Sequence, residues 1–116
     1  MLKEISVSEK PWGHEELWAH TSRYVGKILC IKAGHRLSRQ YHKVKDESIY
    51  VLKGLLILEL GEDPIEVKIL KEGQNYRITP NTVHRFRSLY DPVTLVEVST
   101  PEVDDVVRLQ DEYGRA

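Results

Sequence analysis

The most informative stretch of the chain is GHRLSRQYHKVKDE, residues 34–47, which Gly54 closes seven residues further on. Side chains alternate along an extended strand, so Gln40 and His42 are expected on the same face. Glu47 follows a tight polar turn at the start of the next strand. This placement allows its carboxylate to fold back beside Gln40 and His42.

A second segment, far along the chain, supplies another candidate ligand. His84 follows the turn residues Pro80-Asn81. An amide oxygen, two imidazoles and a carboxylate form a borderline ligand set that suits zinc, manganese, iron, cobalt or nickel. The same residues also have an ordinary structural interpretation, because an isolated strand histidine usually packs or faces solvent and a strand-start glutamate is usually a solvated charge. Spacing alone leaves both interpretations open.

The rest of the pattern is mostly of period two, with turn residues about every ten positions. We expect strands at 25–31, 36–42, 48–52, 55–60, 65–70, 76–78, 83–88 and 93–98. Short strands at this spacing predict an all-β sandwich or barrel. Only residues 103–113 carry apolar side chains at helical spacing, with Pro101 just before them, so we expect a short C-terminal helix or loop there.

Composition restricts the class of protein. With 116 residues, 17 Lys+Arg and 18 Asp+Glu, the chain predicts one domain over 1–116 and no basic nucleic-acid surface. The longest apolar run, 55–58, is far shorter than the roughly 20 residues that cross a bilayer, and the first residues lack the apolar region of a secretory signal. We therefore expect a cytoplasmic protein without a membrane partner. The single cysteine, Cys30, is interpreted as a buried thiol, and metal binding through sulfur is not expected.

Two spaced patterns resemble the cupin motifs. The first is Gly34, five residues, Gln40-Tyr41-His42, four residues, Glu47, six residues and Gly54, with glutamine where that motif usually has its first histidine. The second is Gly73, five residues, Thr79-Pro80-Asn81, two residues and His84. Both occur in the expected order. The resemblance implies a cupin-type double-stranded β-helix, a jelly-roll barrel with a metal inside its mouth.

A narrower resemblance covers nearly the whole chain. It is to the cupin domain of type II mannose-6-phosphate isomerases, which also forms the C-terminal half of bifunctional mannose-1-phosphate guanylyltransferases. The segments that carry it are Lys10-Pro11-Trp12-Gly13, Gly34-His35-Arg36-Leu37-Ser38, Gln40-Tyr41-His42, Val83-His84-Arg85, Leu95-Val96-Glu97-Val98, Asp104-Asp105-Val106-Val107-Arg108 and Asp111-Glu112-Tyr113-Gly114-Arg115.

This resemblance implies a metal-dependent sugar-phosphate isomerase that interconverts mannose 6-phosphate and fructose 6-phosphate. One divalent ion, zinc first and manganese, iron, cobalt or nickel as alternatives, would be held by Gln40, His42, Glu47 and His84. Glu97 shares a strand face with Leu95, which makes it the first candidate for the general base. Arg36 and Arg85 are the candidate phosphate anchors, although a rim salt bridge explains Arg36 equally well.

Other classes of function remain open at this point. The domain could be a non-enzymatic metal- or sugar-binding cupin, a metal-cupin oxygenase, or an isomerase that works with a separate nucleotidyltransferase chain. His14, His20 and His35 have no partner at ligand spacing and are interpreted as surface residues. A homodimer is expected from the fold, since cupins often pair through sheet edges.

Overall fold

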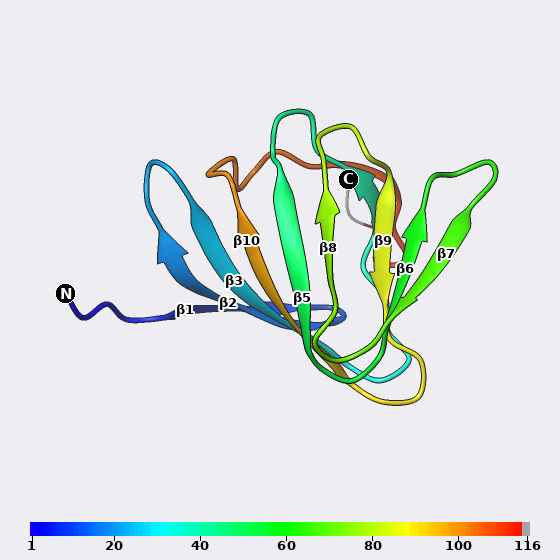
Figure 1. The fold of residues 1–116 in the computed structure, drawn as a ribbon, viewed down its shortest axis with the longest axis horizontal. Coiled ribbons are helices and arrows are strands. Elements are labelled where there is room, and N and C mark those ends of the chain that lie inside the picture. The colour runs from blue at the N-terminus through cyan, green and yellow to red at the C-terminus, as the bar shows by residue number, and fades with distance from the viewer. Residues whose placement is uncertain (115–116) are drawn as a thin grey trace.

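The computed structural model describes residues 1–114, which form two antiparallel sheets facing each other (Figure 1). One sheet has six strands, in the spatial order β1 (Ser6–Lys10), β2 (Gly13–His20), β3 (Val25–Ile31), β10 (Val93–Ser99), β5 (Glu47–Lys53) and β8 (Asn75–Ile78). The other has five strands, in the order β11 (Val107–Gln110), β4 (Arg39–Tyr41), β9 (His84–Arg87), β6 (Leu56–Leu60) and β7 (Glu66–Leu70). This all-β double-stranded β-helix confirms the predicted fold class.

Period-two patterning explains why the central strands form. In β10, Val93, Leu95 and Glu97 are almost fully buried on one face. Leu95 lies opposite Leu29 of β3 and Val51 of β5, so the inward faces of three strands meet in a single apolar layer. Strands of this kind gain stability from cross-strand side-chain pairs and from burial of apolar area. This layer fixes the position of Glu97 relative to the second sheet.

The two motif segments are brought together by the pairing of β4 with β9. Gln40 lies directly opposite His84 in that ladder, although 44 positions separate them in sequence. Gly54 ends the first motif with a φ of +88°, and a Cβ atom there would lie 2.4 Å from the carbonyl oxygen of Pro92. Glycine is therefore required at this turn by both backbone conformation and space.

The C-terminal region, expected as a short helix or a loop, does not form the helix. Within the described residues there is no helix, and Val107–Gln110 instead forms β11, which pairs with β4. A helix of about ten residues is marginal by itself, whereas pairing with β4 satisfies the backbone groups of this segment. Figure 1 shows the chain after β10 crossing from the first sheet to the second before it enters β11.

All eight predicted strands occur, with ends that differ by up to three residues. The largest difference is in β4, which begins at Arg39 and not at residue 36. The sequence pattern missed β11 and the N-terminal hairpin of β1 and β2, whose turn places Lys10 opposite Gly13. The described residues contain no helix long and apolar enough to cross a membrane.

Candidate metal centre and its cavity

Three polar side chains from three strand ends converge at the mouth of the barrel. His42 follows β4, Glu47 begins β5 and His84 begins β9, and all three are at least 95% buried. Oε1 of Glu47 lies 3.2 Å from Nε2 of His42 and 3.3 Å from Nε2 of His84. The structure thus brings together three of the four predicted metal ligands.

Hydrogen bonds to the backbone orient both imidazole rings. Nδ1 of His42 lies 2.5 Å from the carbonyl oxygen of Asp105, and Nδ1 of His84 lies 2.8 Å from that of Thr82. A carbonyl oxygen only accepts, so each Nδ1 donates and each Nε2 of a neutral ring presents a lone pair. Fixing the ring through its second nitrogen is the usual arrangement of histidine ligands.

Within residues 1–114, the converging atoms have no partner besides one another. Nε2 of His42, Nε2 of His84 and Oε1 of Glu47 are all buried without a hydrogen bond. Three buried lone pairs that face one another are costly to leave unsatisfied. Metal bonds of about 2.0–2.1 Å at tetrahedral angles separate two ligand atoms by about 3.3 Å, which matches the observed distances. The site therefore fits a divalent ion bound by two imidazoles and a carboxylate.

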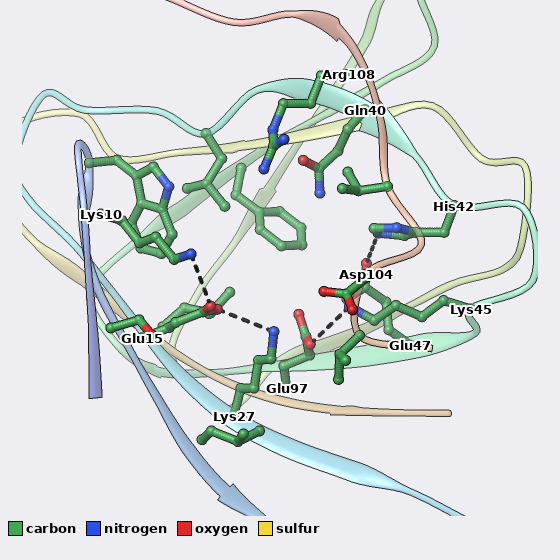
Figure 2. A pocket seen from close by; sticks show the side chains of 18 of the residues that line it. Lys10, Glu15, Lys27, Gln40, His42, Lys45, Glu47, Glu97, Asp104 and Arg108 are labelled. Carbon is green, nitrogen blue, oxygen red and sulfur yellow. Dashed lines mark hydrogen bonds and ion pairs between the residues drawn. The ribbon is translucent and has the colours of Figure 1, made fainter. Parts of the chain in front are cut away.

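Gln40, the predicted fourth ligand, lies in the cavity wall next to this group (Figure 2). Its Oε1 atom accepts a hydrogen bond of 2.6 Å from Oγ of Ser38. An amide oxygen has two lone pairs, so this bond leaves one available. Metal ligation by Gln40 stays a prediction.

A buried cation joins the metal ligand to the candidate base. Nζ of Lys45 lies 3.2 Å from Oε2 of Glu97 and 3.5 Å from Oε2 of Glu47.

Burial and the charge of Glu47 raise the pKa of Glu97 to about 8. Burial also opposes charge on Glu47. The contacts with His42, His84 and Glu97 and the charge of Lys45 outweigh this effect and hold the Glu47 pKa well below its usual value. The pKa values of two adjacent carboxyl groups are thus shifted in opposite directions, an arrangement typical of acid–base sites.

Asp105 anchors the turn that carries Lys45. Its carboxylate accepts hydrogen bonds from the backbone N–H groups of Lys43, Val44 and Lys45, at 3.1, 2.7 and 2.9 Å. These bonds lower the pKa of Asp105 to about 2. Since the carbonyl of the same residue orients His42, the segment between β10 and β11 holds both the metal ligand and the turn in place.

The cavity extends from the triad to the N-terminal hairpin and has a volume of about 520 Å³. At its far end, Nζ of Lys10 lies 3.4 Å from Oε1 of Glu15, and Nζ of Lys27 lies 3.3 Å from Oε2 of the same carboxylate. One carboxylate neutralises only one of these two ammonium groups. This end of the cavity therefore carries excess positive charge from the lysine pair. The Arg108 side chain also points into the cavity, beside its cross-strand partner Gln40 (Figure 2).

The two arginines predicted as phosphate anchors lie outside the cavity lining. Arg36 precedes β4 in an isolated bridge with Arg87 and forms an ion pair with Glu112. Strand alternation does not extend back to Arg36, and Leu37 faces the cavity in its place. Arg85 is 1% exposed, and its guanidinium donates to the carbonyl oxygens of Leu37 and Gln110.

Several cavity residues were not singled out from the sequence. Lys45 belongs to a polar turn whose direction depends on Asp105, 60 positions later, so no local pattern reveals its burial. Lys10 and Lys27 belong to strands that face the cavity only because the N-terminal hairpin extends the first sheet. A strand-pairing prediction that joined β1, β2 and β3 would have identified both.

A double-stranded β-helix with two histidines and a glutamate converging inside its mouth is a cupin, and this chain is one. Within that class it belongs to the family described as mannose-6-phosphate isomerase C-terminal, whose sequence model matches residues 3–111.

Curated relatives include the xanthan biosynthesis protein XanB of Xanthomonas campestris, 33% identical over 110 residues, and the mannose-1-phosphate guanylyltransferase ManC of Salmonella typhimurium, 34% identical. Both alignments cover 91% of this chain. The chain spans only 23% and 22% of the length of these two relatives.

Solved structures of similar fold include KdgF from Halomonas sp., with a TM-score of 0.75 and 20% identity, covering 88% of this chain and 91% of that one. CapF from Staphylococcus aureus has a TM-score of 0.81 and 15% identity, covering 92% of this chain and 34% of that one. At these identities the likeness establishes the fold alone.

Proposed function

We propose that this domain is a metal-dependent aldose–ketose isomerase that interconverts mannose 6-phosphate and fructose 6-phosphate. The observation that carries the proposal is the position of Glu97. It lines the same cavity as the orphaned His42 and Glu47 atoms, and Lys45 joins it to the ligand set. Membership in a family described as mannose-6-phosphate isomerase supports the choice of sugar.

The charge distribution along the cavity favours a substrate with two different ends. The triad end presents Glu47, Glu97 and Asp104, with one cation, Lys45, against the two glutamates. The opposite end presents two lysines that share Glu15. A sugar phosphate has hydroxyl and carbonyl oxygens that ligate a metal and, at the other end, a dianion that pairs with cations.

His42, Glu47 and His84, with Gln40 as the predicted fourth ligand, would hold the metal ion. A divalent ion bound there supplies Lewis acidity that polarises the sugar carbonyl or the neighbouring hydroxyl. The protein itself moves the proton. Glu97 removes the hydrogen on C2 of the aldose and returns it to C1, while the O2 hydroxyl proton passes to O1. This transfer forms the ketose through an enediolate without any co-reactant.

Lys10 and Lys27 replace Arg36 and Arg85 as the proposed phosphate anchors. Lys27 is the more enclosed of the two lysines, with 14% of its side chain exposed against 31% for Lys10. A phosphate bound here would pair with the charge that Glu15 leaves uncompensated. Electrostatic pairing in a partly enclosed cavity is stronger than at an open surface.

The proposal is tested by incubating the zinc-loaded chain with fructose 6-phosphate and measuring mannose 6-phosphate over time. A chelator-treated sample is the control, and a Glu97→Gln variant tests the base. Metal-dependent product in the wild type and not in the variant supports the proposal. Thermal stabilisation by the sugar phosphate without product would favour a binding cupin, and metal-dependent oxygen uptake would favour an oxygenase; either result overturns it.

A further inference from the structure

A second group of ligand-type side chains lies on the opposite face of the six-stranded sheet. His14 of β2 is the direct cross-strand partner of Cys30 of β3. Glu16 lies two residues after His14, on the same face of β2. Because side chains alternate, this face points away from the cavity, which Glu15 and Leu29 line.

The three side chains approach one another closely. A nitrogen of His14, a carboxylate oxygen of Glu16 and Sγ of Cys30 all lie within 4.8 Å of one another. Nε2 of His14 is 3.4 Å from Oε2 of Glu16. Zinc bonds of about 2.0–2.3 Å to N, O and S atoms give tetrahedral ligand separations of about 3.3–3.6 Å. The histidine and the glutamate already have this separation, and the sulfur lies within 4.8 Å of both.

We propose that Cys30, His14 and Glu16 form a second metal site that binds a zinc-class divalent ion at the junction of β2 and β3. A thiolate, an imidazole and a carboxylate are the three ligand types that zinc takes in proteins. The group is accessible, with 36% of the His14 side chain and 28% of the Glu16 side chain exposed, so an ion enters without opening the barrel.

This site differs from the central one in chemistry. It contains sulfur, whereas the central cluster offers only nitrogen and oxygen atoms. Two sequence-based expectations are thereby revised. Cys30 is half-buried on the outer face and not in the core, and His14 does have ligand-type partners. The inference is independent of the proposed isomerase activity.

The chain has a single cysteine, which permits a selective test with Co²⁺. Titration of the full chain should produce a near-ultraviolet charge-transfer band from a cobalt–thiolate bond, and Zn²⁺ should remove it by displacement. Cys30→Ser should abolish the band. His14→Gln and Glu16→Gln should each weaken the Co²⁺ affinity reported by the band at least about tenfold.

Two controls separate this site from its alternatives. Glu9→Gln alters the exposed cross-strand neighbour of His14, outside the ligand group, and should leave the band unchanged. Glu47→Gln, in the central cluster, should also leave it unchanged. In the wild type, Zn²⁺ should slow labelling of Cys30 by a thiol reagent at least about tenfold, and it should not do so in His14→Gln. Absence of the band, or a band equally strong in His14→Gln and Glu16→Gln, would overturn the proposal.

Discussion

Nζ of Lys45 lies 3.2 Å from Oε2 of Glu97, and both side chains are buried inside the barrel mouth. The same ammonium group is 3.5 Å from Glu47, so one cation serves two carboxyl groups. Burial alone would lower the pKa of a lysine, but here the two glutamates raise the pKa of Lys45 above its usual value. Lys45 therefore stays charged and compensates the negative charge of the site.

Lys45→Met should destabilise the metal-free protein. It would leave Glu47 and Glu97 adjacent and buried without their cation, and loss of one partner from a buried ion pair costs about 3–5 kcal/mol. Urea unfolding should show this loss, and added Zn²⁺ should recover part of it by replacing the missing positive charge. Lys43→Met, two residues earlier and exposed, is the matched control and should change stability by less than about 0.5 kcal/mol. Equal effects of the two variants would contradict the role assigned to Lys45.

His84→Ala should remove metal binding from the centre. Losing an outer-sphere partner of a metal ligand costs about 10–100-fold in affinity, so losing the ligand itself should cost at least about a hundredfold. Calorimetric titration with Zn²⁺, in a Cys30→Ser background that removes the thiolate of the proposed outer site, measures this change. His35→Ala changes a histidine outside the cavity and should bind the ion as the wild type does. If His84→Ala binds Zn²⁺ with the wild-type affinity, the ion is not held by the centre of His42, Glu47 and His84.

The sequence predicted the triad because each part of it has a local signal. Strand alternation places Gln40 and His42 on one face, and the resemblance to the two cupin motifs points to Glu47 and His84. Arg36 was wrongly expected to face inward, because alternation breaks between residue 36 and the start of β4. The helix or loop expected at 103–113 missed β11 for a related reason, since pairing of β11 with β4 depends on residues more than 60 positions away. Local patterns predict which side chains share one face of a strand. They do not predict which distant segment pairs with that strand.

Glu97→Gln should retain the metal and lose turnover. The amide keeps the shape of the side chain but cannot accept a proton, and positioned general bases contribute about 10²–10⁴-fold to rate. Metal content by mass spectrometry and the initial isomerisation rate measure the two effects separately. Loss of both together would mean that Glu97 supports the ligand set and does not act as the base.

Lys27→Met should weaken recognition of the phosphate. We expect KM for fructose 6-phosphate to rise about tenfold or more, with a smaller effect on kcat, because the lysine contacts the end of the substrate remote from the reaction. Lys32→Met, in the connection after β3 and outside the cavity lining, is the control and should leave KM unchanged. If Lys27→Met keeps the wild-type KM, the phosphate does not bind at this end of the cavity.

Asp105→Asn should alter the stability of the protein in acid. The folded pKa of about 2 lies below the ordinary value of about 3.9. A lowered carboxyl pKa contributes stability that is fully present above about pH 4 and is lost as the pH falls through about 2. The variant should be less stable at neutral pH and should lose less stability between pH 4 and pH 2. Thermal unfolding across this range tests the prediction, with Asp91→Asn in an exposed turn as the control.

The most direct measurement is proton NMR of fructose 6-phosphate in deuterium oxide with the zinc-loaded chain, beside a chelated sample. We predict mannose 6-phosphate signals only with metal, and deuterium at C2 of the product, because the proton that Glu97 carries exchanges with solvent before it is returned. No conversion over hours with the metal confirmed bound would contradict the isomerase assignment. Conversion that persists after chelation would contradict the metal centre at His42, Glu47 and His84.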